Sequence, residues 1–266
     1  RDAAARGAAG LDRLQLLIQK VTRAYENFEF HVIYHALNNF CSVEMSAFYL
    51  DILKDRLYTS GKDSPERRAA QTAMYRIIHA MTRLMAPILS FTAEEMWGYL
   101  PGNEPESGKV QSVHLADFPV VEEKYLNEGL RNRWDKIQAV RTVAAKALEL
   151  ARRDKVIGHS LDARVELYAD AALQEFLGPY ADRLAEIFII SAAELKGLDE
   201  APESATKSDE VEGLRIAVSS ADGGKCERCW MYSVQVGRDG EHPTLCGRCS
   251  AVVRDTSGKT GVVVEG

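Results

Sequence analysis

The stretch Cys226-Glu227-Arg228-Cys229, followed after sixteen residues by Cys246-Gly247-Arg248-Cys249, decides how the last part of the chain folds. Each Cys-x2-Cys turn can direct two thiolates at one point, and two such turns supply the tetrahedral ligand set that Zn2+ accepts. A zinc ion with four protein sulfurs keeps no open position for water or substrate. The spacing therefore predicts a structural zinc site that carries out no chemistry itself.

Two other interpretations of the four cysteines stay open at the level of sequence. They could form two disulfides or remain separate buried thiols, although disulfides need an oxidising compartment for which nothing else in the sequence argues. A rubredoxin-like iron centre uses the same ligands, but Zn2+ is the commoner occupant of such ribbons. The fifth cysteine, Cys41, lies in an apolar helical stretch and is predicted to be a core residue. We expect one structural zinc ion in a module that presents its loops to a partner.

The composition is that of an ordinary soluble globular protein. The chain has 266 residues, 46% of them hydrophobic and 27% charged, which suits one large or two to three smaller domains. No apolar run approaches the roughly 18 residues of a membrane span, and no signal peptide stands at the start. We therefore expect a cytoplasmic protein without a membrane partner, monomeric by default. Because the chain begins at Arg1 without a methionine, we expect a piece of a longer protein.

The charge of the chain is unevenly distributed. The formal net charge of −6 argues against broad non-specific binding of nucleic acid. Residues 126–161, however, carry eight Lys and Arg against four Asp and Glu, whereas residues 162–212 carry four against thirteen. This pattern is compatible with an RNA-binding face on an acidic protein and equally with solvated helix surfaces.

Helical periodicity dominates the first part of the chain. After an Ala- and Gly-rich start that is predicted to be frayed, apolar residues recur at helical spacing in five segments: residues 11–25, 29–39, 43–58, 65–88 and 92–100. Ser64-Pro65 is predicted to cap the fourth segment, and Thr92–Glu95 to form a capping box for the fifth, with Phe91 and Met96 as its hydrophobic staple. Short polar turns between such helices predict an antiparallel bundle. With a Pro- and Gly-rich connector, which Val113, Leu115 and Phe118 are predicted to hold against the bundle, it forms the first predicted domain, residues 1–125.

The sequence pattern changes after the connector. A long helix with apolar positions from Trp134 to Ala151 is followed by alternating strand patterns at residues 165–169 and 214–218. Residues 173–187 are predicted to be helical, residues 188–191 to form a short strand, and the acidic residues 197–213 to form a mobile loop. Residues 126–220 are thus predicted to be a small α/β module, and residues 221–266 the zinc module.

Catalytic motifs are absent. The sequence lacks a phosphate-binding Gly-x-x-x-x-Gly-Lys-Ser/Thr loop, a Gly-x-Ser-x-Gly elbow and a His-Glu-x-x-His helix. His31 and His35 are spaced to meet on one helix face, but no third ligand has matching spacing, so a seam position in the bundle is the preferred interpretation. No catalytic residue is predicted.

With these features established, the sequence resembles the C-terminal portion of bacterial isoleucyl-tRNA synthetases over nearly its whole length. The resemblance is carried by Tyr25-Glu26-Asn27-Phe28-Glu29-Phe30-His31, by Leu84-Met85-Ala86-Pro87-Ile88-Leu89-Ser90-Phe91-Thr92-Ala93-Glu94-Glu95-Met96-Trp97, and by Ile157-Gly158-His159-Ser160-Leu161. Cys229-Trp230 within the paired Cys-x-x-Cys motifs resembles the C-terminal zinc module of the bacterial isoleucyl enzymes. That module separates the isoleucyl family from the valyl and leucyl ones.

The resemblance implies a mainly α fold of the class I anticodon-binding type, followed by the α/β junction module and the zinc ribbon. It implies a parent enzyme that joins isoleucine to its tRNA using ATP. The two adenylate-forming signatures of class I synthetases, His-x-Gly-His and Lys-Met-Ser-Lys-Ser, are absent here, and the editing domain has no counterpart. We therefore expect a fragment that binds isoleucine tRNA and zinc beside the catalytic and editing domains of its parent, and is inactive alone.

The candidate zinc ligands are Cys226, Cys229, Cys246 and Cys249. For RNA, the candidates combine an aromatic platform with guanidinium and ammonium groups, because looped bases are stacked on such planes and held by their phosphates. They are Trp230, Arg228 and Arg248 in the zinc module; Lys54, Arg56, Arg76 and Arg83 in the bundle; and Arg141, Arg152 and Arg153 after it. Trp230 could instead cap the metal site as a hydrophobic residue. Two rival functions stay open: a protein-interaction adaptor that contains zinc and binds no RNA, and an enzyme with unrecognised catalytic groups.

Overall fold

The computed structural model describes residues 2–102 and 110–259. The chain divides into two compact units, one comprising residues 1–57 and 63–132 and the other residues 58–62 and 133–266. The three domains expected from the sequence stay a prediction. Residues 103–109 of the expected connector and residues 260–266 of the expected zinc module lie outside the described residues.

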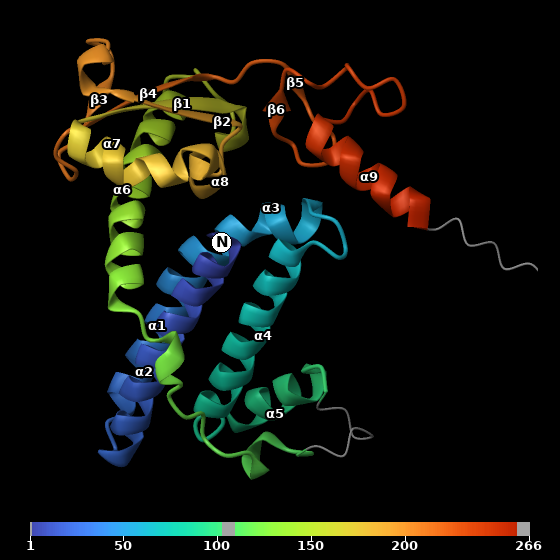
Figure 1. Cartoon of the computed structure of the whole chain (residues 1–266). Coiled ribbons are helices and arrows are strands. Elements are labelled where there is room, and N and C mark those ends of the chain that lie inside the picture. The colour runs from blue at the N-terminus through green and yellow to red at the C-terminus, as the bar shows by residue number, and fades with distance from the viewer. Residues whose placement is uncertain (1, 103–109, 260–266) are drawn as a thin grey trace, which may run out of the picture. The chain divides into compact units, whose positions relative to one another are not determined.

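The first unit is built from helices. In chain order they are α1 (Asp2–Glu26), α2 (Phe30–Asn39), the π-helical segment η1 (Phe40–Leu50), α3 (Asp51–Thr59), α4 (Pro65–Met85) and α5 (Ser90–Tyr99). Helix α1 packs against both α2 and α4, as Figure 1 shows. The fourth helix begins as the sequence predicts, because the Arg67 N–H donates to the Ser64 hydroxyl at 3.2 Å and Pro65 takes the first helical position.

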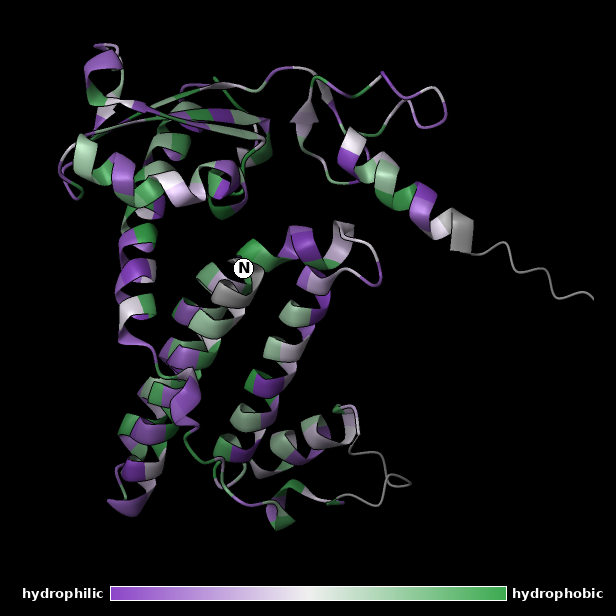
Figure 2. Ribbon diagram, in the orientation of Figure 1, coloured by the Kyte–Doolittle hydropathy of each residue, from purple (hydrophilic) through white to green (hydrophobic). Residues whose placement is uncertain are grey.

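The core of this unit lies between the apolar faces of these helices. Val21, Ile33 and Leu84, from α1, α2 and α4, are fully buried. Figure 2 shows hydrophilic and hydrophobic residues alternating along α1 and α4, which is typical of helices with one buried face. Aliphatic burial of this kind is the main favourable term in folding, at about 25 cal/mol per Å2 of apolar surface.

Three local predictions for the bundle are wrong. The chain is helical from Asp2, so the Ala-rich start extends α1, as expected from the high helix propensity of alanine. The third predicted helix is continuous with the second through η1. Helix α5 begins at Ser90, so Thr92 lies inside it, and Phe91 is 94% exposed and forms no staple. Glu94 instead accepts hydrogen bonds from the Ser112 hydroxyl and the Val113 N–H.

The connector after α5 is held by short 3-10 turns, η3 (Val113–Leu115) and η4 (Glu123–Tyr125). Val113 is buried as predicted. The Phe118 ring packs edge-on against the Tyr25 ring, with the two ring centroids 5.4 Å apart. Leu115, predicted to hold the chain on the bundle, is 75% exposed, so that prediction is wrong.

The second unit contains most of α6 (Glu128–Arg153) and a four-stranded sheet in the order β2-β1-β4-β3. The strands are β1 (Ala163–Ala169), β2 (Ala192–Gly197), β3 (Thr206–Lys207) and β4 (Leu214–Ser220). β1 pairs in parallel with β2 and antiparallel with β4, and β3 pairs antiparallel with β4. Between β1 and β2 lie α7 (Ala171–Leu177), the 3-10 helix η6 (Gly178–Arg183) and α8 (Leu184–Phe188). The predicted fold class is therefore confirmed.

The strand predicted at residues 188–191 is wrong. Ile189 adopts a left-handed conformation, with φ of 59°, and ends α8, so the β2 strand begins only at Ala192. The acidic loop 197–213 contains the 3-10 turn η7 (Leu198–Glu200) and strand β3. Within the described ranges, no helix is long and apolar enough to cross a membrane.

Candidate zinc centre and nucleic-acid interface

The four cysteines of the predicted metal site come together in the second unit. Strands β5 (Gly224–Lys225) and β6 (Tyr232–Ser233) form a hairpin whose turn carries Cys226 and Cys229, and Cys246 and Cys249 stand at the start of α9 (Gly247–Lys259). Their sulfurs all lie within 4.8 Å of one another, with Cys229 Sγ and Cys246 Sγ 3.8 Å apart. Zn–S bonds of about 2.3 Å place tetrahedral sulfurs about 3.8 Å apart, so the geometry fits zinc.

The electrostatics of the four thiols allow all of them to ionise only when a cation binds among them. Burial alone would raise the pKa of the Cys226 thiol, but backbone N–H donors, including that of Cys246 at 3.3 Å, lower it to about 6. Burial raises the pKa of Cys229 to about 12 and raises that of Cys249 as well. The backbone therefore stabilises one thiolate, whereas four neighbouring thiolates need a divalent ion to balance their charge.

A small apolar shell covers the cysteines. Met231, Val236 and Leu245 pack against them, and the Arg228 guanidinium donates to Cys249 Sγ at 3.6 Å. Sequence reasoning missed the three apolar residues, because isolated apolar residues in a loop have no periodicity that could mark them.

A polar cluster ties the long loop between the cysteine pairs to α9. Asp239 accepts hydrogen bonds from the Ser250 hydroxyl and from the Arg254 guanidinium, which also pairs with Glu241. The Ser250 hydrogen bond is the main reason that the pKa of Asp239 falls to about 2. The loop is thereby attached to the helix that carries Cys249.

Trp230 does not cover the metal site. Its side chain is 62% exposed, and its backbone is left-handed, with φ of 65°, because the turn closes through a 2.8 Å hydrogen bond from the Trp230 N–H to the Cys226 carbonyl. Arg248 is also exposed and has its Nη2 atom 3.7 Å from Met231 Sδ. Arg228 is partly buried and is directed at the cysteine sulfur. The structure thus places Trp230 and Arg248 on the surface of the zinc module.

The cationic candidates in the bundle are less uniform. Lys54 is exposed and pairs with Asp51 at 3.0 Å. Arg76 lies 3.6 Å from Glu122, and Arg83 donates to the carbonyls of His79 and Asp117. Burial lowers the pKa of Arg83. Arg56 is only 5% exposed, which leaves little surface for RNA.

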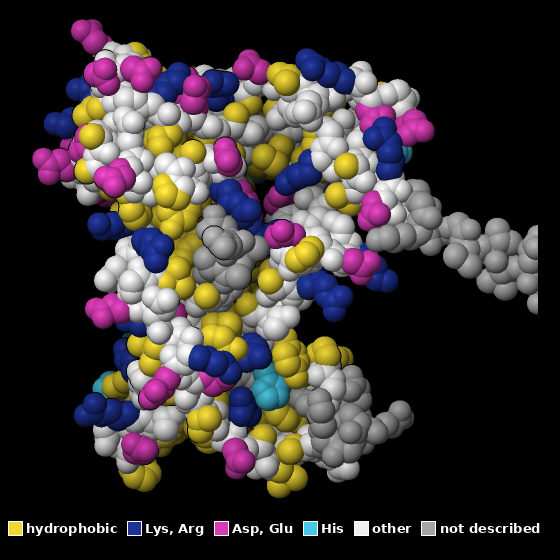
Figure 3. Space-filling view, in the orientation of Figure 1, with side chains coloured by type: hydrophobic (Ala, Val, Ile, Leu, Met, Phe, Trp, Pro, Cys, Tyr) yellow, Lys and Arg dark blue, Asp and Glu magenta, His cyan; other side chains and the backbone are white. Residues whose placement is uncertain are grey.

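The candidates on α6 divide by role. Arg141 donates to the Ile187 carbonyl at 3.1 Å and so holds α8 against α6. Arg152 and Arg153 are exposed and form surface ion pairs with Glu149 and Asp154, respectively. Figure 3 shows basic and acidic side chains interspersed over the visible face.

Comparison with known families identifies the chain. The family described as "Anticodon-binding domain of tRNA ligase" matches residues 9–167. The chain belongs to this family. The family described as "Zinc finger found in FPG and IleRS" matches residues 223–252, which include all four clustered cysteines. The metal of this anticodon-binding protein is therefore one structural zinc ion, as predicted.

Relatives of this anticodon-binding chain include isoleucine–tRNA ligases. It is 52% identical over 244 residues to that of Geobacter sulfurreducens, 49% over 250 residues to that of Desulforamulus reducens, and 50% over 246 residues to that of Moorella thermoacetica. Each alignment covers 92% of this chain and 26% of the relative, so the chain spans about a quarter of the length of the curated relatives it matches. The predicted resemblance to the C-terminal portion of isoleucyl-tRNA synthetases is confirmed.

Proposed function

We propose that this chain is the tRNA-binding C-terminal region of an isoleucine–tRNA ligase and that it recognises the anticodon stem and loop of isoleucine tRNA. The parent enzyme would use this grip while it attaches isoleucine to the tRNA with ATP. The membership of residues 9–167 in the anticodon-binding family supports the proposal. The similarity to isoleucine–tRNA ligases over 92% of the chain supports isoleucine as the amino acid that the parent enzyme attaches.

The observation that carries the proposal is the exposed Trp230 ring beside a zinc site closed by four sulfurs. Cys226, Cys229, Cys246 and Cys249 would hold the ion, which fixes the turn but leaves no coordination position for a substrate. An unpaired base of the anticodon loop would stack on Trp230, and the Arg248 guanidinium would hold a phosphate or a base edge. Base stacking on an aromatic ring is worth about 1–3 kcal/mol per base.

The rest of the chain would contribute a grip on the stem. The exposed cations Lys54, Arg76, Arg152 and Arg153 are the proposed contacts there, and each of their present ion pairs is a surface pair that RNA phosphate can replace at little cost. Arg228 and Arg141 would act by positioning the zinc turn and α8. We further propose that residues 1–125, 126–220 and 221–266 act as three domains of a monomeric, cytoplasmic enzyme that also contains catalytic and editing domains.

A gel-shift titration tests the proposal. The chain is titrated against isoleucine tRNA, against a tRNA of the same length with a mismatched anticodon, and again after removal of zinc. Preference for the isoleucine anticodon that disappears without zinc is the expected result. Equal binding of both tRNAs at all zinc contents would contradict recognition by the zinc module. ATP–pyrophosphate exchange by the isolated chain is expected to be absent, and measurable exchange would revive an enzyme function of this chain alone.

The zinc-containing protein adaptor is not favoured, because the family match is to anticodon-binding domains of tRNA ligases. The salt dependence of binding separates the two functions. Binding to tRNA should weaken steeply with salt because counterions leave the phosphates, with a slope of log K against log salt that scales with the number of phosphates contacted.

A further inference from the structure

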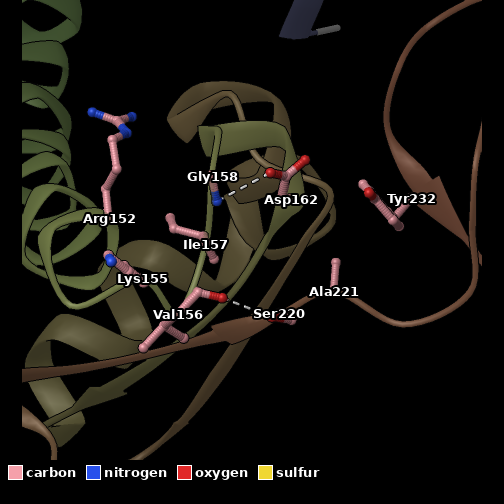
Figure 4. Close-up of a pocket in the computed structure, with 9 residues that line it drawn as sticks. All are labelled: Arg152, Lys155, Val156, Ile157, Gly158, Asp162, Ser220, Ala221 and Tyr232. Atoms are coloured by element: carbon pink, nitrogen blue, oxygen red, sulfur yellow. Dashed lines mark hydrogen bonds between the residues drawn. The ribbon is translucent and has the colours of Figure 1, made fainter.

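A cavity of about 490 Å3 opens in the second unit where the loop after α6 meets the end of β4. Its lining comes from three places in the chain: the last turn of α6 and the loop after it, with Arg152, Lys155, Val156, Ile157, Gly158 and Asp162; the end of β4, with Ser220 and Ala221; and Tyr232 on β6. In Figure 4, Arg152 and Lys155 lie on one side of this space and Tyr232 on the other. The size lies within the roughly 300–1,000 Å3 typical of small-molecule sites.

The charge of the cavity is positive. Among the described side chains, no carboxylate forms an ion pair with the Lys155 ammonium. Arg152 pairs with Glu149, which is 69% exposed, so a phosphate can displace that carboxylate at little cost. The lining carboxylate of Asp162 accepts the N–H groups of Gly158 at 3.2 Å and of His159 at 2.7 Å. Its negative charge is therefore partly balanced by the backbone.

Tyr232 supplies aromatic surface opposite the cations, and Val156 supplies apolar surface beside Lys155. The Tyr232 backbone is fixed by a 2.7 Å hydrogen bond from its N–H to the Ser191 hydroxyl, which joins the β6 strand to the α/β sheet. Val156 is 45% exposed. Its carbonyl accepts a hydrogen bond from the Ser220 hydroxyl at 2.9 Å, which joins the loop after α6 to the end of β4. A cationic side facing an aromatic side suits a ligand with a phosphate at one end and a planar ring at the other.

We propose that this cavity binds one unpaired nucleotide of the tRNA, with its phosphate on Arg152 and Lys155 and its ribose or base against Tyr232 and Val156. The proposal rests on the proposed function and adds to it a second contact for RNA, outside the zinc turn. The two contacts would hold the RNA at Trp230 and at the end of α6, both within the second unit. Lys155, which was not among the residues predicted to bind tRNA, becomes one of the two phosphate ligands.

The backbone at Lys155 allows its side chain to be removed without unfolding the site. Lys155 is left-handed, with φ of 60°, and closes α6 through hydrogen bonds from its own N–H to the Arg152 carbonyl and from the Val156 N–H to the Ala151 carbonyl. Glycine is the residue best suited to this position of a Schellman motif. Lys155→Gly therefore removes the cation while keeping, or raising, the stability of the fold. Phe28 and Ile189 are also left-handed where α1 and α8 end, so this conformation itself is no evidence for binding.

The test compares two cavity variants, Lys155→Gly and Arg152→Gln/Lys155→Gln, with Lys146→Gln as the matched control. Lys146 is another cation of α6, 63% exposed, that neither lines the cavity nor belongs to the proposed RNA contacts. The double variant is expected to weaken the binding of isoleucine tRNA by about tenfold to a hundredfold, as the removal of charged hydrogen bonds does. Its slope of log K against log salt should fall by about 1 for each phosphate that the cavity no longer binds. Lys146→Gln should stay within about threefold of the unsubstituted chain, and Lys155→Gly should weaken binding with an unchanged or higher Tm.

Each outcome decides between the two proposals. If the unsubstituted chain binds tRNA and the double variant binds equally well, or no worse than Lys146→Gln, the cavity proposal fails while the proposed function stands. If the unsubstituted chain fails to bind tRNA, the proposed function fails. The full chain is then titrated with AMP, and the NMR shifts of the Val156 and Ile157 methyl groups show whether the cavity binds a nucleotide. Shifts that vanish in the double variant and persist in Lys146→Gln support the cavity as a nucleotide site by itself. An absence of shifts overturns it.

Discussion

Arg131 forms a two-pronged ion pair with Asp12, 119 residues earlier in the chain. Its Nε atom lies 2.8 Å from Oδ2 of the carboxylate and its Nη2 atom 2.9 Å from Oδ1, and Oδ1 also accepts the Asn127 N–H at 2.7 Å. Asp12 is only 1% exposed, so its charge is held almost entirely by these donors. The pair fastens the beginning of α6 to the middle of α1.

A second buried polar side chain holds the connector one turn further along α1. Gln15 is 2% exposed, accepts the Glu122 N–H at 2.8 Å through Oε1, and donates to the Leu11 carbonyl through Nε2. Together, Asp12 and Gln15 fix both ends of the segment from Glu122 to Arg131. The first turn of α6 is therefore attached to the bundle by polar contacts to α1.

Replacing the buried carboxylate should destabilise the bundle. Asp12→Asn is expected to lower the free energy of unfolding by about 2 to 3 kcal/mol, because Arg131 is deprived of a charged, two-pronged partner. The measurement is urea unfolding followed by circular dichroism. Glu44→Gln is the matched control. Glu44 pairs at 3.5 Å with Arg13, which lies beside Asp12 on α1, and both side chains of this pair are about a quarter exposed. A decrease under about 1 kcal/mol is expected there, and equal decreases in the two variants would contradict the role of Asp12.

The same pair should make stability depend on pH. Burial alone would raise the pKa of Asp12, but the hydrogen bonds from Arg131 and Asn127 outweigh it and hold that pKa below its ordinary value of 3.8. A lowered folded pKa means that the contribution of Asp12 is fully present above the unfolded value and is lost as the pH falls through the folded one. The difference in unfolding free energy between the unsubstituted chain and Asp12→Asn should therefore be constant at neutral pH and shrink below pH 3.8. A difference that shrank already between pH 7 and pH 5 would argue against this assignment.

The sequence predicted those features whose signals are local. Cysteine spacing indicated the metal site, Ser64-Pro65 indicated the start of α4, and apolar periodicity indicated the helices and the strands β1 and β4. Each of these depends on residues that are close in the chain, so pattern and physical cause coincide.

The features missed depend on contacts between distant residues. Glu94 looked like part of a capping box, yet its carboxylate holds Ser112 and Val113 of the connector. Nothing near Asp12 or Gln15 in the sequence distinguishes them from solvated residues, because their partners lie more than 100 residues away. The cavity beside Lys155 likewise joins α6, β4 and β6, and no motif connects these elements.

Removal of one zinc ligand should unfold the zinc module and spare the bundle. Cys249→Ser is expected to reduce the zinc content from one ion to none and to remove the protection from hydrogen exchange in residues 224–256, because metal binding supplies the folding free energy of such modules. Protection of Ile33 and Leu84, which are fully buried in the first unit, should persist. Cys41→Ser is the matched control, since Cys41 is partly buried in the bundle core and far from the four clustered cysteines in the sequence. Full zinc content in Cys249→Ser would contradict the four-sulfur site.

Trp230 should report on RNA binding through its own fluorescence. The other two tryptophans, Trp97 and Trp134, are 3% and 6% exposed, so quenching by acrylamide will come mainly from Trp230, which is 62% exposed. If a base stacks on its ring, saturating isoleucine tRNA will protect this fluorescence from acrylamide. Trp230→Gly suits the left-handed backbone and should keep zinc, yet weaken binding by roughly 5-fold to 150-fold, the equivalent of one stacked base. Trp230→Phe, which keeps a smaller ring, should recover part of that affinity. Quenching that is unchanged by bound tRNA would show that the RNA is held without this ring, and recognition would then have to be sought at Arg248 and at the cavity beside Lys155.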